Sequence, residues 1–444
     1  MSARPSLWPT DRSAQHRRMT DKVPSLLRNR DFLLLWQGSA VSSLGSNVST
    51  VAYALLVLAL TGSPADAGFT GFVALLPQLL FQLPAGALVD RWNRKRTMIW
   101  CDVLRGLTVG SVAAALLAGH LHLAHVLVAG FIEGTLTVCF RIAASAAVPN
   151  VVHPSQLALA LSHNEARARG AAMLGQPLGG VLFGLGRAVP FLFDAFSYLV
   201  SMGALLMIRK DFQAERPAQP GRPGTWGHLA QLGAEIGEGV RWLWRQPFLR
   251  TTTFLIAGSN LLFQALFLTV IVSAQQHGGS SAAIGVMFGV AAVGGVVGSL
   301  VAPALERRLS MKVVVIGANW AWALLVPLLL IVRNPYLIGA VYALMCFVGP
   351  VWNVVISAYQ LAVTPDRIRG RVLGAAGMVA FGAVPLGSLI GGLLLSRYGA
   401  DVTVWLLAGW MVLLAVISTV SPAVRAAPSL TEATPAEAQP ATTG

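Results

Sequence analysis

Long apolar segments separated by short polar ones run along almost the whole chain. The hydrocarbon core of a membrane is about 30 Å thick, so a helix that crosses it needs roughly 20 apolar residues. Segments of that length recur twelve times, and each predicts a membrane-spanning helix. Their approximate cores are residues 32–60, 68–89, 97–118, 121–143, 166–187, 189–208, 249–275, 281–304, 313–332, 335–360, 371–396 and 401–420.

The basic residues test this count independently. The chain has 32 Lys and Arg, and an inward amino terminus leaves only Arg187, Arg333 and Arg397 in outward-facing loops. Arg105 and Arg141 fall inside helices, and the others lie in tails, loops or helix ends on the inner side. Because cytoplasmic loops are enriched in Lys and Arg, we predict a multi-pass protein of the cytoplasmic (inner or plasma) membrane with both termini in the cytoplasm.

The longest polar interruption separates the first six predicted helices from the last six. Within it, apolar residues recur at helical spacing and predict an amphipathic helix on the inner membrane surface, or a plain linker helix. These residues are Leu229, Leu232, Ile236, Val240 and Leu243. The predicted organisation is a cytoplasmic tail at 1–30, a six-helix bundle at 31–208, a cytoplasmic central loop at 209–247, a second six-helix bundle at 248–421 and a disordered cytoplasmic tail at 422–444.

The two halves contain similar segments rich in glycine and proline. The predicted fifth helix contains GQPLGG at 175–180, and the predicted eleventh contains PLGSLIGG at 385–392. Glycine lets membrane helices approach closely and proline removes a backbone hydrogen bond, so we interpret the first segment as a helix-packing motif. Its residues are Gly175, Pro177, Gly179 and Gly180. Two halves with matching parts are typical of secondary transporters, which bind substrates between repeats.

The loop between the predicted second and third helices carries the most distinctive motif. It reads GALVDRWNRKR at 86–96 and follows the pattern G-x-L-x-D-R-x-x-R-K. The acid can cap one helix while the cations anchor the turn, and the charge cluster can hold neighbouring helix ends as the halves move. The alternative is an ordinary basic loop of the inner side. The gating-motif residues are Gly86, Leu88, Asp90, Arg91, Arg94 and Lys95.

On these residues the chain resembles the major facilitator superfamily, whose best-known signature occupies this loop. RNRDFLLLW at 28–36, DAFS at 194–197 and EGVRWLWR at 238–245 are similar to exporters of the enterobactin-exporter and macrolide-efflux branch. The resemblance covers about residues 28–420. It implies an all-α membrane fold of two pseudo-symmetric six-helix bundles. It also implies export of an amphipathic small molecule (a drug, siderophore or secondary metabolite) by alternating access with proton antiport.

One segment departs from the superfamily pattern. Antiporters of this superfamily often carry Gly-Pro-x-x-Gly-Gly in the fifth helix, whereas here Gln176 follows Gly175 and the proline is displaced to Pro177. The glycines and the proline keep their physical roles, so proton antiport remains the expected coupling. An importer with the same fold is the alternative.

Charged residues inside the predicted helices are functional candidates, because burying them in a membrane is costly. Glu133 lies halfway through the predicted fourth helix, so it is the candidate for binding the coupled proton. The alternative is an acid that locks helices together. Asp102 and Arg105, one turn apart, predict an ion pair with a structural or gating role. Asp194, near the outer end of the predicted sixth helix, is expected to cap it or to gate the outer side, and Arg141 can snorkel.

The resemblance also implies that the first, fourth, seventh and tenth helices line the cavity. Uncharged polar residues near the midplane of these helices are therefore candidates for the substrate path. They are Asn47, Asn260, Gln264 and Asn353. Each could instead make an interhelical hydrogen bond worth about 0.6–2 kcal/mol.

Composition and charge exclude other classes of protein. Only 11% of the residues are charged, against about 25% in a soluble domain. The net charge of +14 comes from short blocks between apolar runs rather than from one basic face, so we expect no nucleic-acid partner. The expected partners are a small-molecule substrate and membrane lipids, and we expect the chain to function as a monomer.

Cofactor chemistry and catalysis find little support in the sequence. Three histidines, His120, His122 and His125, cluster in one outer loop without a carboxylate or cysteine beside them, so no metal site is expected. A membrane-embedded enzyme would need clusters such as Asp-x-x-Asp, and an ATP-driven pump would need a Gly-Lys-Ser/Thr loop. Neither is present. We predict a protein that is not an enzyme and has no cofactor, with the proton as coupling ion.

Overall fold

The computed structural model describes residues 25–89, 92–210, 212, 237–365 and 367–427, which are almost entirely helical. The elements in chain order are η1 (Leu26–Arg28), α2 (Arg30–Thr61), α3 (Pro64–Val89), α4 (Arg94–Leu117), α5 (Leu123–Val151), η2 (Pro154–Gln156), α6 (Leu157–Leu185), α7 (Val189–Met207), α9 (Pro247–Gln276), α10 (Ser281–Arg308), α11 (Met311–Leu325), η3 (Val326–Leu330), α12 (Pro335–Val363), α13 (Arg369–Val420) and α14 (Pro422–Arg425).

Local chemistry in the sequence explains where several of these helices begin and end. Asn29 Oδ1 accepts a hydrogen bond from the Phe32 amide at 3.1 Å and caps α2. Asn93 caps α4 in the same way, through the Arg96 amide at 3.0 Å. Such caps satisfy amide groups that have no partner inside the helix. Gly62 ends α2 at φ 67°, a conformation that glycine adopts at little cost.

Nine helices of the described part are long and apolar enough to cross a membrane: α2, α4, α5, α7, α9, α10, the continuous run of α11 and η3, α12 and α13. Among these, α13 has 52 residues and takes up both of the last two predicted spans, because only Gly399 (φ 78°, ψ 176°) breaks its helical backbone. The predicted second and fifth spans correspond to α3 and α6, which are not among the nine. That the chain crosses the membrane twelve times therefore remains a prediction.

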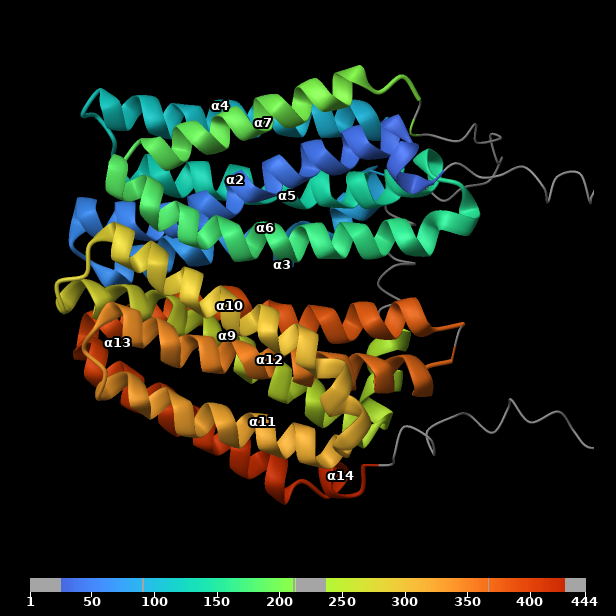
Figure 1. The fold of residues 1–444 in the computed structure, drawn as a ribbon, viewed down its shortest axis with the longest axis vertical. Helices are drawn as coiled ribbons and strands as arrows, with labels where there is room; N and C mark the ends of the chain where they lie inside the picture. The colour runs from blue at the N-terminus through green and yellow to red at the C-terminus, as the bar shows by residue number, and fades with distance from the viewer. Residues whose placement is uncertain (1–24, 90–91, 211, 213–236, 366, 428–444) are drawn as a thin grey trace, which may run out of the picture.

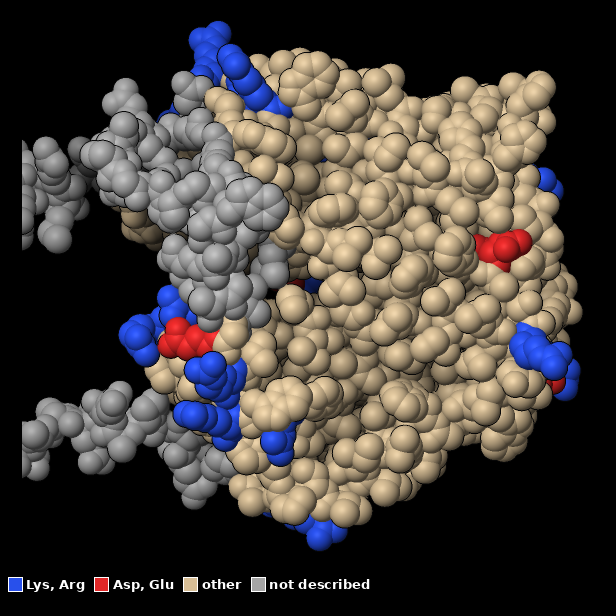
Figure 2. Space-filling model, turned by 180° about the vertical axis from the view of Figure 1, so that it is seen from behind, with Lys and Arg blue, Asp and Glu red and all other residues tan. Residues whose placement is uncertain are grey.

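The surface of the molecule matches a lipid environment. Large apolar side chains are exposed along the helices, including Leu117 at 70%, Leu300 at 76% and Ile331 at 76%. Figure 2 shows a broad band with almost no charged side chain, and Lys and Arg gather at one end of it. Apolar side chains facing outward are what a bilayer core requires.

The helices form two groups, with α2 to α7 on one side and α9 to α14 on the other (Figure 1). We call the face where α2 begins and α14 ends the tail face, and the opposite one the far face. Between the two halves, α3 packs against α13 and α6 packs against α10.

These contacts between the halves involve glycines near the far-face ends of the helices. A Cβ on Gly68 of α3 would lie 2.6 Å from Gly392 Cα of α13, and a Cβ on Gly180 of α6 would lie 2.5 Å from Gly285 Cα of α10. Helix backbones can meet this closely only where side chains are absent. The halves are therefore closed together at the far face.

Some of the predicted features lie outside the described residues. They are Asp90 and Arg91 of the gating motif and most of both tails and of the central loop, including positions 229–236 of the predicted amphipathic helix. Residues 237–245, at the end of that loop, are helical. Glu238 there lies 2.5 Å from Arg371 of α13, which ties the loop's end to the second half.

Candidate functional site

Two neighbouring cavities lie inside the molecule. The central cavity, of about 250 Å³, is bounded by α2, α3 and α5 of the first half and by α9 and α13 of the second. The tail-side cavity, of about 700 Å³, is lined by α2, α4, α5 and α6 of the first half, near their tail-face ends. Ser46, Thr137 and Arg141 line both. The interior is therefore hollow toward the tail face and closed at the far face.

Glu133 lines the central cavity and is held by two tyrosines from other helices. Its side chain is 8% exposed. Tyr53 of α2 donates to Oε2 at 3.0 Å, and Tyr198 of α7 donates to Oε1 at 3.0 Å. No basic side chain of the described residues forms an ion pair with it. A carboxyl group with neutral partners can bind or release a proton without breaking an ion pair.

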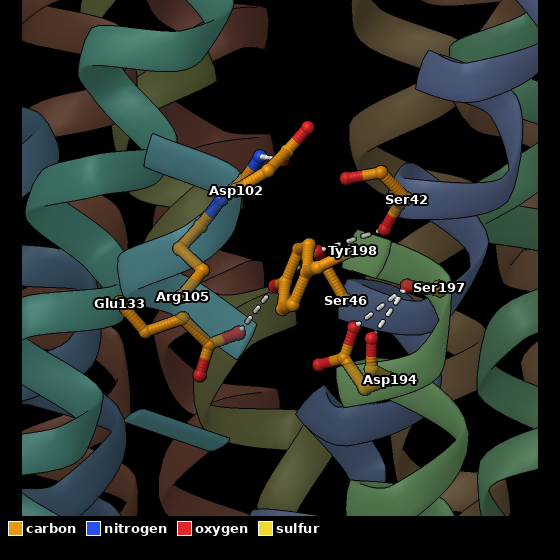
Figure 3. Close-up of polar contacts among 8 residues, drawn as sticks. All are labelled: Ser42, Ser46, Asp102, Arg105, Glu133, Asp194, Ser197 and Tyr198. Carbon is orange, nitrogen blue, oxygen red and sulfur yellow. Dashed lines mark hydrogen bonds and ion pairs between the residues drawn. The ribbon is translucent and has the colours of Figure 1, made fainter. Parts of the chain in front are cut away.

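The buried ion pair expected between Asp102 and Arg105 is present next to this carboxyl group. The two side chains are almost fully buried. The guanidinium of Arg105 lies 4.4 Å from the centres of both the Phe140 and the Tyr198 rings. Arg105 therefore packs against the tyrosine that binds Glu133, and Figure 3 shows Tyr198 beside both side chains.

A second buried carboxyl group, Asp194, lies close to the same tyrosine (Figure 3). It is 0% exposed, and Ser49 of α2 donates to its Oδ2 at 2.6 Å. Ser197 donates to its backbone oxygen at 2.7 Å and to Oδ1 at 3.3 Å. The N-cap of α7 is Ala188, so the expected capping role of Asp194 is wrong. Its position along the helix is the predicted one, but its buried side chain faces α2, where Ser49 binds it.

The four substrate-path candidates have different surroundings. Asn47 lines the tail-side cavity, and its Nδ2 donates to the Ser43 oxygen of its own helix at 2.7 Å. Gln264 lines the central cavity. Asn260 Nδ2 instead donates to the Ala380 oxygen at 2.8 Å and ties α9 to α13. Asn353 is exposed and is not among the described residues that line either cavity.

The described residues of the gating motif bind the tail-face ends of neighbouring helices. Lys95 Nζ donates to the Ile208 oxygen at 2.5 Å, and Arg94 Nη1 donates to the Ala146 oxygen at 2.8 Å. The carbonyl ends of helices carry partial negative charge, which stabilises cations there. Gly86 is half-buried and Leu88 is 37% exposed. The motif thus joins α4 to α5 and α7 within the first half.

The helix-packing motif faces two neighbours at once. A Cβ on Gly175 would lie 3.0 Å from the Leu44 oxygen of α2, and one on Gly179 would lie 2.5 Å from the Val48 oxygen. Gly180 faces the opposite half, where a Cβ on Gly285 would lie 2.5 Å from the Pro177 oxygen. One short segment therefore sets the spacing of α6 from its own bundle and from the other.

We predict that Gly180→Val opens the far face. The added side chain would overlap α10 while the halves are closed, and such overpacking costs about 1–3 kcal/mol. A cost of that size shifts a two-state population by about 10–100-fold. The measurement is the labelling rate of Ser145→Cys, which lines the tail-side cavity, on a background lacking the three native cysteines. We expect slower labelling. Gly110→Val, with open space around it, is the control, and equal rates in both variants would contradict the prediction.

Sequence reasoning missed the partners that surround Glu133. Tyr53, Tyr198 and Ser49 contribute hydroxyl groups, and Arg167 lines the tail-side cavity. Tyr198 directly follows the DAFS segment, which was the only signal near it. In the part of the chain that the structure describes, no three His, Cys, Asp or Glu side chains gather as a metal site requires.

Two helical bundles that enclose a cavity are typical of polytopic membrane transporters. A family model described as a transmembrane secretion effector matches residues 23–441. The chain therefore belongs to this family of the major facilitator superfamily, and the superfamily expected from the sequence is confirmed.

Relatives over nearly the full length agree with this assignment. The multidrug efflux pump Tap of Mycolicibacterium fortuitum is 27% identical over 407 residues, which cover 88% of this chain and 96% of Tap. Tap of Mycobacterium tuberculosis is 26% identical over 412 residues, covering 90% and 94%. These relatives are transporters, in line with a protein that is not an enzyme.

Solved structures show the same fold. The nucleoside transporter NupG superposes with a TM-score of 0.65 at 15% identity, covering 88% of this chain and 98% of NupG. A bacterial homologue of the human lysosomal transporter Spinster, in an inward-facing and unoccupied conformation, gives a TM-score of 0.63 at 16% identity, covering 89% and 96%. The predicted all-α membrane fold is thereby confirmed.

Proposed function

We propose that the chain is a secondary transporter that exports an amphipathic small molecule across the plasma membrane in exchange for protons. The observation that carries this proposal is Glu133, a carboxyl group whose partners among the described residues are neutral and which lies on the wall of a cavity between the two halves. The similarity to multidrug efflux pumps supports export, and the apolar surroundings of Phe267 and Leu268 in the central cavity suit an amphipathic substrate.

The tail face is the cytoplasmic face in this proposal. Basic residues at the tail face, such as Arg94, Lys95 and Arg425, support that orientation through the bias of cytoplasmic segments toward Lys and Arg. The tail-side cavity, near this face, would then receive substrate from the cytoplasm, which is the side from which an exporter must load.

Transport proceeds by alternating access between two arrangements of the halves. In the described arrangement, Gly180 and Gly285 bring the halves together at the far face. Proton binding at Glu133 changes its interactions with Tyr53 and Tyr198, and so biases the equilibrium between the arrangements. The helix-end contacts of Lys95 and Arg94 keep the first half rigid while it moves. One chain supplies both halves, so a monomer embedded in lipid suffices, with no cofactor beyond the proton.

Accumulation of drugs and siderophores in an efflux-deficient bacterium that expresses the full chain tests the proposal. We expect lower accumulation of at least one amphipathic compound than in cells with an empty vector, and the difference should disappear when a protonophore collapses the proton gradient. A difference that survives the protonophore would contradict proton antiport. Higher accumulation than in the vector control would indicate an importer, and export would have to be abandoned.

A further inference from the structure

Two arginines face the tail-side cavity without a partner among the described residues. Arg141 of α5 is exposed to both cavities, and Arg167 of α6 lines the tail-side cavity with its Nε buried and unbonded. Neither makes a hydrogen bond or an ion pair with any described residue. Arg141 lies ten residues before the end of α5 at Val151, or about 15 Å along the helix. Arg141 lines both cavities, so its side chain does not simply snorkel to the membrane surface.

The acidic side chains near these arginines have other partners, and Glu133 of the central cavity is held by its two tyrosines. Glu165, which also lines the tail-side cavity, binds Arg169 at 2.9 Å, and both side chains are more than half exposed. Asp102 pairs with Arg105. An arginine inside a membrane protein is costly unless an anion or a water-filled space compensates it. In the part of the chain that the structure describes, no carboxylate pairs with either of these two positive charges of the tail-side cavity.

The remaining walls also suit an anion. Four serines of α2 line the tail-side cavity, together with side chains of α5 and α6 that can donate hydrogen bonds: Ser39, Ser42, Ser43, Ser46, Ser145 and Asn164. The central cavity beyond Arg141 is bounded largely by apolar side chains, including Leu75, Phe267 and Leu268. A polar, positively charged chamber thus adjoins an apolar one, and Arg141 lies at their junction.

We infer that the tail-side cavity is a binding subsite for the anionic group of an amphipathic substrate, a carboxylate, sulfonate or phosphate, held by Arg141 and Arg167. Guanidinium groups bind such oxyanions through paired, charge-assisted hydrogen bonds. The apolar body of the substrate then occupies the central cavity. This inference rests on the proposed transport function and narrows its substrate class to amphipathic anions and zwitterions.

The test compares two probes that differ only in charge, dansyl-leucine with its carboxylate and dansyl-leucinamide without it. Fluorescence titrations use the purified full chain in phosphatidylcholine nanodiscs, with empty nanodiscs subtracted. We expect the carboxylate probe to bind at least about tenfold more tightly. Arg141→Gln and Arg167→Gln should each remove about tenfold of that affinity, leave the amide probe within about twofold, and Arg141→Lys should restore part of the preference.

Arg397→Gln is the control, because Arg397 is an exposed arginine of α13 and is not among the described residues that line either cavity. We expect it to bind both probes as the wild type does. A monodisperse elution profile identifies variants that fold. Equal wild-type affinity for the two probes, or equal loss of both probes in Arg141→Gln, would overturn the inference.

Further arms separate the anion's source and the two proposals. Nanodiscs that contain phosphatidylglycerol should leave the affinity of the carboxylate probe unchanged if the site binds solutes. A lower affinity in these nanodiscs would show that lipid headgroups bind at the same anion site. Binding does not depend on transport direction. Charge-selective binding without any change in accumulation would contradict the proposed export and support the anion site. Export of cationic drugs without charge-selective binding would support the proposed export and contradict the anion site.

Discussion

Glu133→Gln is expected to abolish uphill transport and to leave downhill exchange of substrate intact. Glutamine resembles the protonated acid in shape and cannot release a proton. Its amide oxygen can accept a hydrogen bond from one of Tyr53 and Tyr198, and its NH2 group can donate to the hydroxyl oxygen of the other, so the packing around α5 should persist. Because the charge at this position can no longer change, the proton gradient cannot bias the equilibrium between the two arrangements of the halves.

The measurement uses everted vesicles and a substrate found by the accumulation assay. We expect energised uptake into Glu133→Gln vesicles to fall to the level of vesicles lacking the protein. Exchange between equal substrate concentrations on the two sides should stay within about twofold of wild type, since it needs no proton movement. Asp401→Asn, which alters an exposed carboxylate of α13, is the control and should behave as wild type.

Asp194 provides the outcome that would contradict this assignment. It is also a fully buried carboxyl group with hydroxyl partners, and Asp194→Asn can keep the hydrogen bond from Ser49. If Asp194→Asn uncouples transport while Glu133→Gln remains fully coupled, the proton binds at Asp194. Loss of both uphill transport and exchange in Glu133→Gln would instead indicate structural damage, and the prediction would be wrong.

The second large effect is expected from Arg105→Leu, which leaves Asp102 buried without its cation. Breaking a buried pair by removing one partner costs about 3–5 kcal/mol, because the remaining charge is uncompensated. The leucine would also lose the contacts of the guanidinium with the Phe140 and Tyr198 rings. We expect a lower midpoint of thermal unfolding of the purified protein in detergent, measured by the intrinsic fluorescence of its tryptophans.

A double variant distinguishes loss of charge compensation from loss of packing. In Asp102→Leu with Arg105→Leu, the uncompensated charge is absent, and apolar replacements of buried ion pairs are often neutral or stabilising. We therefore expect the double variant to recover most of the lost stability. Equal destabilisation of the single and double variants would show that the stacking of Arg105 on the two rings, rather than the ion pair, stabilises this part of the bundle.

The sequence was sufficient to predict the helices and several contacts that depend on neighbours along the chain. Apolar length set the approximate positions of α2 and α5. The pairing of Asp102 with Arg105 followed from their spacing of three residues, since side chains one turn apart lie on the same helical face. The depth of Glu133 followed from its position halfway along the predicted fourth helix.

What the sequence did not predict is the direction in which each polar side chain points around its helix axis. Asn260 and Gln264, one turn apart in α9, were nominated together, yet Asn260 binds α13 and Gln264 lines the central cavity. The contacts of Glu133 join residues 80 and 65 positions apart in the chain. A soluble helix reveals its buried face by alternating polar and apolar residues.

A membrane helix carries no such mark, because lipid and protein interior are both apolar. Length, depth and local pairing were therefore determined by the sequence alone. The tertiary structure decided which side chains share a cavity: it brought Tyr53 and Tyr198 to Glu133, placed Asp194 beside them, and left Arg141 and Arg167 facing open space. Those contacts arise from how six helices pack around one another, and no spacing within a single helix encodes them.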